Sequence, residues 1–397
     1  MSTPCCAYPH SVRGEQWDHA VSSHVVNGVG SVSRLGSLLR EHGATRVLII
    51  TDPGLRKTGM VDDVAAHIRK AGLSVHIHSE IPANPSTGSL DVATDVARDC
   101  RADYVVAIGG GSALDASKAV ALLANTELSA ETLTGSEEIS APALPIAAIP
   151  TTAGTGAETN GFGVMESSDH RKVYIGSDQT VPELVILDAE LTLGLPATVT
   201  AACGFDAIIH GAESLLSAGA TTLSRAYAAE SLRLATAALP VVVADGSDIE
   251  GRSQMMVGAH LAGRALTLSG LGLVHGIGHS ITATNGTPHG VALASVAGPA
   301  MRFGIDAAPA RYADLARALG VDSADRAVDL IAAIAETVGL PGTLAAVGIT
   351  EDEVGVIVEK TLADAVTRNT PRVPSAHELE ALLRDGLDGQ KENARGA

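Results

Sequence analysis

Aromatic and basic side chains are both scarce in this chain of 397 residues. One Trp, five Tyr and three Phe make up the aromatic content, so a core built from the 46% of hydrophobic residues must consist of aliphatic side chains. Lys and Arg number 27 against 45 Asp and Glu, which gives a net charge of −18. Because this much negative charge repels phosphate backbones and anionic lipid, we expect no nucleic-acid partner and no membrane partner.

Cysteine is equally rare, with four residues and no C-x-x-C pair. Cys5 and Cys6 stand together in an irregular N-terminus, while Cys100 and Cys203 lie far apart in helix-like sequence. This pattern excludes a small disulfide-stapled module and favours a reduced, cytoplasmic protein. The first twenty residues contain no apolar run of signal-peptide length, and no later stretch reaches about 18 uninterrupted apolar residues, so we expect neither a leader nor a transmembrane segment.

The two halves of the chain differ in their hydrophobic patterns. Strand-like runs at 46–51, 74–78, 104–108 and 146–149 alternate with helix-like segments at 60–71, 90–100 and 113–123. Such alternation predicts a parallel sheet covered by helices on both faces. Beyond Pro196 the sequence is rich in Ala and Leu with helical periodicity. We therefore predict an α/β domain over residues 1–195 and an all-α domain over residues 196–397.

A glycine-rich loop, Gly109-Gly-Gly-Ser112, follows the strand-like run 104–108 and opens a helix-like segment. Free amides and the positive end of the helix dipole converge at such a place, and glycine lets a phosphate approach, so the loop predicts a pyrophosphate site. An ordinary tight turn is the alternative, because the loop is not the G-x-G-x-x-G fingerprint. Asp115 and Lys118, three residues apart, are equally compatible with a surface ion pair.

A second loop, Pro150-Thr-Thr-Ala-Gly-Thr-Gly-Ala-Glu158, also follows a strand-like run. Its three Thr hydroxyls and two glycines can line a ligand without steric obstruction, although the motif alone could be a Thr-rich turn. Open α/β sheets bind their ligands at the carboxyl ends of strands, where both loops are expected. The two loops together therefore predict a nucleotide site.

Histidines and one aspartate recur at helical spacing in the second half. Asp206 has apolar neighbours and stands four residues before His210; His275 and His279 repeat this spacing, and His289 follows. A single buried histidine is usually an ordinary core residue, and a buried carboxylate without a partner is costly. One carboxylate and up to four imidazoles among small apolar residues are typical of a divalent-cation site with one spare histidine.

In these motifs, taken in order over residues 26–383, the chain resembles the iron-dependent, group III alcohol dehydrogenases. The resemblance rests on 109–118, on 150–158, on the Asp206 and His275 pairs, and on Thr287-Pro-His-Gly290. It implies an N-terminal dinucleotide-binding α/β domain and an all-α C-terminal metal-binding domain, a two-domain architecture like that of dehydroquinate synthase, with a metal in the cleft between them. It also implies hydride transfer between a nicotinamide and a small alcohol or aldehyde.

The same resemblance implies roles for single residues. Asp206, His210, His275 and His289 would be the metal ligands, of Fe²⁺ or alternatively Zn²⁺, and His279 would be the catalytic proton-relay residue. The implied cofactor contacts are Asp52, Asn84, Gly110, Gly111, Ser112, Asp115, Lys118, Thr151, Thr152, Thr155 and Lys172. A carboxylate at position 52 accepts hydrogen bonds from both ribose hydroxyls and repels a 2′-phosphate, so NAD is favoured over NADP. Relatives are often dimers, and we expect a homodimer.

The sequence departs from the family between its second and third histidines. Many relatives have aromatic residues there and at position 266, whereas this chain has none at 280–288 and carries Leu266. We therefore expect a polar-substituted primary alcohol or aldehyde of the lactaldehyde, succinic semialdehyde or phosphonoacetaldehyde type. The alternatives are a maleylacetate-reductase-like reductase, a sugar-phosphate cyclase of the dehydroquinate synthase type, and a redox sensor with a structural metal; few basic residues near the histidines disfavour the cyclase.

Overall fold

The computed structural model describes residues 23–134, 139–169 and 171–388. Cys5, Cys6 and the first twenty residues, where the sequence predicts an irregular segment without a leader, lie outside these ranges. The described chain forms two compact units. The first contains 23–203 and 241–263, and the second contains 204–240 and 264–388. The domain boundary after residue 195 stays a prediction.

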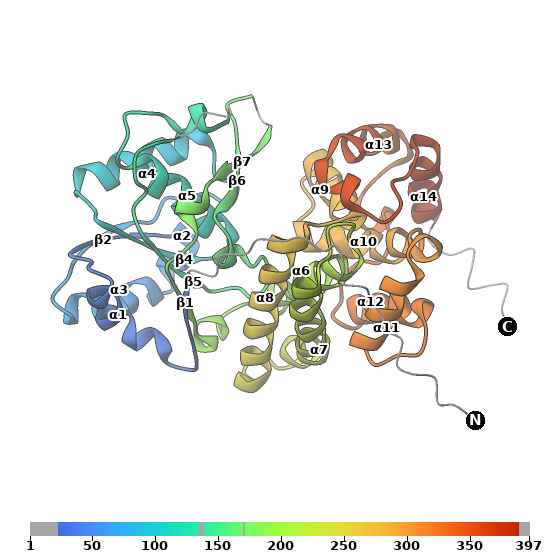
Figure 1. Cartoon of the computed structure of the whole chain (residues 1–397), viewed down its shortest axis with the longest axis horizontal. Coiled ribbons are helices and arrows are strands. Elements are labelled where there is room, and N and C mark those ends of the chain that lie inside the picture. Colours follow the sequence, from blue (N-terminus) through green and yellow to red (C-terminus); the bar gives the residue numbers. More distant parts are fainter. Residues whose placement is uncertain (1–22, 135–138, 170, 389–397) are drawn as a thin grey trace. The chain divides into compact units, whose positions relative to one another are not determined.

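A six-stranded parallel sheet in the order β1-β8-β5-β4-β2-β3 forms the centre of the first unit (Figure 1). The predicted strands are present, and β1 and β8 add two more. The six strands are β1 (His24–Asn27), β2 (Arg46–Ile50), β3 (Ser74–His78), β4 (Tyr104–Gly109), β5 (Ile146–Pro150) and β8 (Leu184–Leu187). A separate antiparallel hairpin joins β6 (Phe162–Glu166) to β7 (Lys172–Gly176).

Helices cover both faces of the sheet, as the alternating sequence predicts. Successive residues of β2 point to opposite faces, so Val47 and Ile49 enter one apolar core while Leu48 and Ile50 enter the other. Helices α1 and α3 pack in the first core, and α4 and α5 pack in the second (Figure 1). The helices of this part are α1 (Leu35–Glu41), α2 (Pro53–Lys57), α3 (Met60–Lys70), α4 (Thr87–Asp99) and α5 (Gly111–Leu123), with 3₁₀ turns η1 (Ser31–Arg34), η2 (Ala130–Thr134), η3 (Ala157–Thr159), η4 (Asp178–Thr180) and η5 (Ala189–Thr192).

The described chain beyond residue 196 is helical, so the predicted fold class is confirmed for both halves. Its α-helices are α6 (Ala197–Leu216), α7 (Thr222–Ala244), α8 (Ile249–Ser269), α9 (Leu273–Asn285), α10 (His289–Arg302), α11 (Pro309–Ala318), α12 (Ala324–Thr337), α13 (Val354–Ala363) and α14 (Ala376–Asp388). The 3₁₀ turns are η6 (Ile305–Ala307), η7 (Ala345–Val347), η8 (Glu351–Glu353) and η9 (Ala365–Asn369). The candidate metal ligands lie on α6, α9 and α10.

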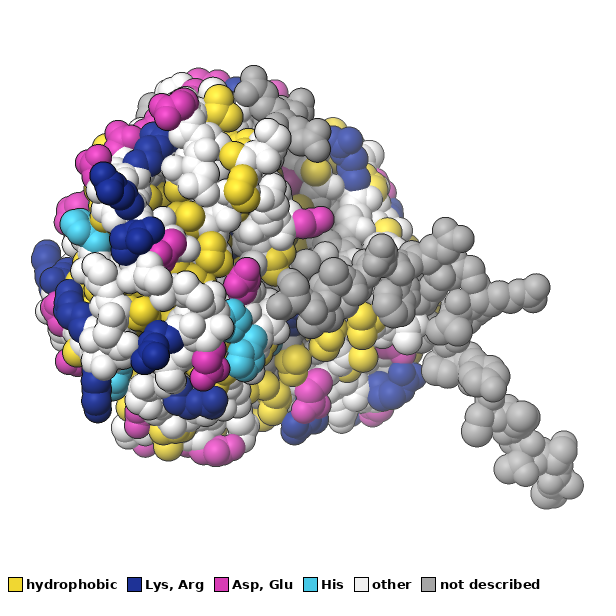
Figure 2. All heavy atoms as spheres, turned by 60° about the vertical axis from the view of Figure 1, so that its left-hand side comes forward, with side chains coloured by type: hydrophobic (Ala, Val, Ile, Leu, Met, Phe, Trp, Pro, Cys, Tyr) yellow, Lys and Arg dark blue, Asp and Glu magenta, His cyan; other side chains and the backbone are white. Residues whose placement is uncertain are grey.

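By length and composition alone, one described helix, α7, could cross a membrane. Helices α8 and α9, which meet at a bend of 102°, pass the same test when they are taken as one span. Core helices of soluble proteins also pass it, so this is weak evidence for a membrane span. On the face shown in Figure 2, Lys and Arg side chains stand apart among neutral and acidic ones rather than in one continuous patch.

Candidate functional site

The predicted cofactor loops follow three neighbouring strands of the first unit. Asp52 follows β2, the glycine loop follows β4, and the Thr-rich loop follows β5. β2 and β4 are parallel neighbours, but the chain continues from them in opposite directions across the sheet. β3 is added on the edge side of β2, whereas β5 is added on the far side of β4. Such a switch point is where open α/β sheets bind ligands, at the carboxyl ends of the strands.

Close contacts join these loops. Thr151 donates its backbone N–H to the Gly109 carbonyl at 2.9 Å. A methyl group on Gly111 would lie 2.9 Å from Cγ2 of Thr155, and one on Gly110 would lie 3.5 Å from Oγ1 of Thr152. The loops therefore fit together without room for larger side chains, and Gly110, the N-cap of α5, offers no side chain to accept the first amides of that helix.

Gly109 is a position where the backbone requires glycine. Its φ is +149°, and a methyl group there would lie 2.8 Å from Cβ of Ala113 and 3.5 Å from Oδ2 of Asp52. Asp52 itself caps α2, because its Oδ1 accepts the N–H of Leu55 at 2.9 Å. Its carboxylate is thus held next to the glycine loop, with Oδ2 on the side of Gly109.

The predicted contacts Asn84, Ser112 and Lys172 also lie together. Lys172 Nζ, at the start of β7, donates to Oδ1 of Asn84 at 3.1 Å. Ser112 Oγ donates to the carbonyl of Ala83, which precedes Asn84 in the loop between β3 and α4. One region of the first unit is therefore bordered by the β6–β7 hairpin, the glycine loop and the loop between β3 and α4.

Lys118 and Asp115 are not a surface pair. Lys118 is 1% exposed, and its Nζ lies 3.4 Å from Oδ1 of Asp115 and 3.1 Å from Oδ1 of Asn160. Burial lowers the pKa of Lys118 and raises the pKa of Asp115, while their mutual attraction opposes both shifts. Asp115 also accepts the N–H of Val164 at 3.0 Å, so the pair fastens α5 to the segment that begins β6.

The Thr-rich loop is fastened to α8 by contacts that the sequence did not indicate. Gly156 has φ +63°, and a methyl group on it would lie 2.5 Å from Cα of Gly263. The buried residues Glu158 and His260 contact each other, with 3.0 Å between Oε1 and Nδ1. His260 stands apart from the other histidines in the sequence, and no spacing links it to Glu158.

In the second unit, three imidazoles surround one carboxylate oxygen. The distances from Asp206 Oδ1 to the Nε2 atoms of His210, His275 and His289 are 3.3, 3.4 and 3.5 Å. The ligand atoms of Asp206, His210 and His275 lie within 4.8 Å of one another, and these side chains are buried. His289, at the start of α10, is 35% exposed.

These distances fit a shared cation better than hydrogen bonds, which are about 2.7–3.2 Å long. Two atoms that each lie about 2.1 Å from one ion at a tetrahedral angle are about 3.4 Å apart. Oδ1 of Asp206 and Nε2 of His275 are also buried without a hydrogen-bond partner among the described residues. A carboxylate oxygen with imidazole nitrogens suits Fe²⁺ or Zn²⁺, so the residues fit a divalent metal ion.

Two carboxylates that the sequence analysis missed hold the histidines of α9. Glu213 on α6 accepts a hydrogen bond from Nδ1 of His275 at 2.6 Å. Asp364, between α13 and η9, accepts one from Nδ1 of His279 at 2.8 Å. Glu213 lies seven residues after Asp206 on the same helical face, so its spacing is a signal that could have found it. Asp364 is 85 residues from His279 and gives no such signal.

Burial and neighbouring charges shift the pKa values in this cluster. Burial lowers the pKa of His210 to about 4, although Asp206 opposes the shift. Burial also lowers the pKa of His275, but Glu213 and Asp206 outweigh it and raise that pKa to about 9. Burial raises the pKa of Asp206, yet the imidazoles of His210 and His289 outweigh it and hold the pKa well below its usual range. Asp206 is therefore ionised and His210 neutral, the states in which both bind metals.

His279 lies beside this group of four. Its ring stacks on that of His289, with centroids 5.3 Å apart, and lies 5.8 Å from that of His275. The side chain is 31% exposed, and Asp364 holds Nδ1. His279 is thus the one predicted site histidine for which no contact with Asp206 is found among the described residues.

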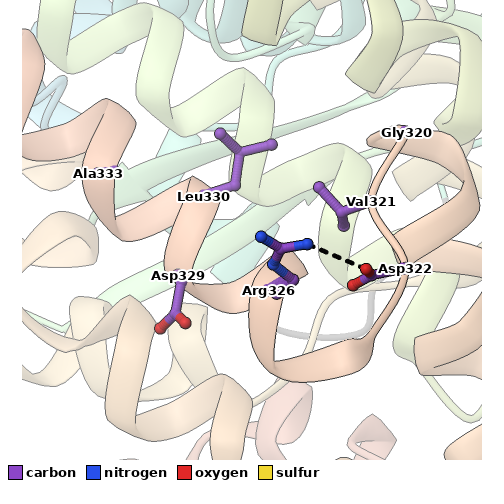
Figure 3. A pocket seen from close by; sticks show the side chains of 7 residues that line it. All are labelled: Gly320, Val321, Asp322, Arg326, Asp329, Leu330 and Ala333. Carbon is purple, nitrogen blue, oxygen red and sulfur yellow. Dashed lines mark hydrogen bonds and ion pairs between the residues drawn. The ribbon is translucent and has the colours of Figure 1, made fainter.

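A broad hollow of about 680 Å³ also opens beside α12 (Figure 3). Val321 and Leu330 line it together with Arg326, whose Nη1 lies 2.9 Å from Oδ2 of Asp322. None of the predicted site residues lines this hollow, so it contributes nothing to the candidate site.

Comparison with known proteins gives consistent matches. Two family models match the chain, "Iron-containing alcohol dehydrogenase" over residues 22–189 and "Fe-containing alcohol dehydrogenase family, C-terminal" over 200–387. The NAD-dependent methanol dehydrogenase of Bacillus methanolicus is 32% identical, covering 91% of this chain and 97% of its own. The lactaldehyde reductase of Escherichia coli K12 is 32% identical, covering 89% and 95%.

A solved structure supports the same grouping. The sulfoacetaldehyde reductase of Bifidobacterium kashiwanohense, solved in complex with NAD⁺, has a TM-score of 0.90 and 27% identity, and covers 95% of this chain and 100% of its own. Family models, relatives and structure agree over both halves of the molecule. The chain therefore belongs to the iron-containing alcohol dehydrogenase family and is an oxidoreductase of the alcohol dehydrogenase and aldehyde reductase class.

Proposed function

We propose that this chain interconverts small, polar-substituted primary alcohols and their aldehydes with NAD, around one divalent metal ion that is iron in the native enzyme. The metal ligands would be Asp206, His210, His275 and His289. The observation that carries the proposal is the set of three imidazole nitrogens 3.3–3.5 Å from one buried carboxylate oxygen. Bound there, a divalent ion supplies Lewis-acid polarisation of the substrate oxygen.

His279 is the residue we assign to proton transfer. Asp364 accepts the hydrogen bond from its Nδ1, which leaves Nε2 to take or give a proton. Its partial exposure gives that proton a path to water. The ring lies beside the proposed ligands without contacting Asp206, as a group that acts on substrate rather than on the ion would.

The first unit provides the cofactor site in this proposal. The N-terminus of α5, with Gly110, Gly111 and Ser112, would hold the pyrophosphate. The Asp52 carboxylate, whose Oδ1 caps α2, would accept the ribose hydroxyls through Oδ2 and disfavour the 2′-phosphate of NADP. Asp115 and Lys118 act at a distance from the ligand, by holding the glycine loop against β6. Thr151, Thr152, Thr155 and Lys172 would line the nicotinamide half, and Asn84 would make a further contact with the cofactor.

A polar substrate is favoured by the segment that follows His279. It has no aromatic residue, and its Thr282 hydroxyl has no hydrogen-bond partner among the described residues. The hydroxyls of Ser280 and Thr284 donate to carbonyls of α9 and are not available to a substrate. The relatives named lactaldehyde reductase and sulfoacetaldehyde reductase carry names of polar aldehydes. A homodimer and a cytoplasmic location remain predictions of the same kind.

A substrate panel tests the proposal. Protein reconstituted with Fe²⁺, and separately with Zn²⁺, is assayed with NADH and NADPH against aldehydes that carry a hydroxyl, carboxylate, phosphonate or sulfonate group and against unbranched alkanals. We expect net oxidation of NADH by the polar aldehydes, with Fe²⁺ giving activity. A preference for long-chain alkanals would contradict the polar pocket. A turnover without net NADH oxidation would instead support a cyclase, which uses NAD only transiently.

A further inference from the structure

Both carboxylate oxygens of the buried residue Glu213 accept hydrogen bonds. Oε2 accepts from Nδ1 of His275 at 2.6 Å and from the N–H of Gly272 at 3.0 Å. Oε1 accepts from the N–H of Val274 at 2.6 Å. The residue is 4% exposed, and a methyl group on Gly272 would lie 3.0 Å from Oε1. Glu213 therefore fits closely against the start of α9, where the His275 ring and two backbone amides contact its carboxylate.

These contacts replace a missing helix cap. Helix α9 begins at Leu273, and its N-cap, Gly272, has no side chain that could accept the first amides. A carboxylate at this end of a helix is stabilised by the amides and by the positive end of the helix dipole. One side chain on α6 thus fixes both where α9 begins and how its first histidine is turned.

His275 and His210 differ in the contacts of their Nδ1 atoms. Nδ1 of His210 is buried and has no hydrogen-bond partner among the described residues. Nδ1 of His275 contacts a carboxylate at 2.6 Å, so that nitrogen carries a hydrogen, while Nε2 faces Oδ1 of Asp206 at 3.4 Å and is the nitrogen that would give up its proton to bind an ion. Histidines that bind metals typically donate the other ring N–H in this way, which fixes the tautomer and the ring orientation.

From these contacts, and resting on the function proposed above, we propose that Glu213 is a positioning residue of the metal site, which holds His275 with Nε2 directed at the ion. The proposal adds Glu213 to the two proposed ligands that α6 already carries, Asp206 and His210. It also explains why a buried carboxylate stands on the helical face that carries Asp206 and His210. Losing such a partner typically weakens metal binding by about 10-fold to 100-fold.

The test compares Glu213→Gln with the wild-type protein. Co²⁺ affinity is measured by competition with a chromogenic chelator, together with the visible spectrum of bound Co²⁺. We expect Glu213→Gln to bind Co²⁺ about 10-fold to 100-fold more weakly and to show a changed spectrum. Asp364→Asn is the matched control, because it removes the carboxylate from the other histidine of α9, and we expect its Co²⁺ affinity to stay within about threefold of wild type.

A double-mutant cycle separates positioning from helix capping. If Glu213 acts through His275, Glu213→Gln should cost less than about threefold in Co²⁺ affinity when His275→Ala is already present. An equal loss in both backgrounds would overturn the proposal, since it would show that Glu213 only caps α9. Should Glu213→Gln fail to fold, Glu213→Asp, which keeps the charge but is shorter, takes its place in the same cycle.

Failure of the two proposals gives different results. Wild-type protein that binds no Co²⁺, or that binds it equally well after His275→Ala, would contradict the metal site itself. Co²⁺ binding that is weakened by His275→Ala but unchanged in Glu213→Gln would overturn only the role of Glu213.

Discussion

Replacing Asp206 by Asn removes the charge at the centre of the histidine cluster while it keeps the shape of the side chain. The oxygen that is changed lies 3.3–3.5 Å from three imidazole nitrogens and has no hydrogen-bond partner among the described residues. Breaking a buried charged contact costs about 3–5 kcal/mol. At about 1.4 kcal/mol for each factor of ten, metal affinity should fall by about two to three and a half orders of magnitude.

Thermal unfolding makes this loss visible. A metal ion present at 100 times its Kd adds about 2.7 kcal/mol to the stability of the protein that binds it. For a unit of about 150–250 residues, each kcal/mol raises Tm by roughly 2–4 °C, so wild-type protein should gain about 5–10 °C over its metal-free form. At the same metal concentration, which is at most about the Kd of the variant, Asp206→Asn should gain less than about 2 °C over its own metal-free form.

The assay is differential scanning calorimetry of each variant with and without Fe²⁺ or Zn²⁺ under anaerobic conditions, with the metal content of the purified protein measured in parallel. His260→Gln is the control, because it changes a buried histidine that contacts Glu158 rather than Asp206. It should keep the full wild-type shift. An equal shift in Asp206→Asn and wild type would refute the assignment of Asp206 as a ligand.

Four further outcomes are expected. Asp52→Ser keeps an N-cap for α2 but removes the charge, so the NADPH to NADH ratio of kcat/KM should rise at least about tenfold in steady-state assays, while the unfolding free energy changes little. His279→Ala should keep its metal and lose about 10²-fold to 10⁴-fold in kcat, as metal analysis and single-turnover kinetics would show; unchanged turnover would remove its role. Gly156→Ala places a methyl group 2.5 Å from the α8 backbone at φ +63°, so urea unfolding should show a loss of about 2–5 kcal/mol in the free energy of unfolding. Gly72→Ala is the control, because φ there is +82° but no atom lies within 4 Å, and it should lose about 1 kcal/mol. Burial raises the pKa of Asp103, but hydrogen bonds from Thr45 outweigh it and lower that pKa overall. The ionised carboxylate therefore stabilises the fold above the ordinary carboxyl pKa. Asp103→Asn should have a lower free energy of unfolding at pH 7, and the difference from wild type should vanish as the pH falls through the lowered pKa.

The sequence was sufficient for the fold class and for the family. Strand-like runs such as 104–108 became strands because they are short, aliphatic and bounded by turn residues, and the shift to helical periodicity after residue 196 marked the helical half. The expectation of an alcohol dehydrogenase or aldehyde reductase is confirmed, because it depended on several motifs in order rather than on one. The residue assignments at the metal and cofactor sites stay predictions.

Other features depend on distances that spacing does not contain. Helical spacing brought Asp206 to His210, but no pattern indicates that α6, α9 and α10 converge, or that Asp364 meets His279 from 85 residues away. The ambiguity over Lys118 was of the same kind, since a lysine three residues from an aspartate is as compatible with the surface as with the interior. Its burial follows from the segment 160–164 packing over α5, which is a tertiary contact.

Locating the bound metal would show which side chains hold it. Crystals of protein loaded with Fe²⁺ and measured at wavelengths on both sides of the iron absorption edge give a map of the anomalous scatterer alone. We expect one peak per chain, about 2.0–2.3 Å from Asp206 Oδ1 and from the Nε2 atoms of His210, His275 and His289. A peak elsewhere, or an ion that contacts fewer than three of these four atoms, would contradict it.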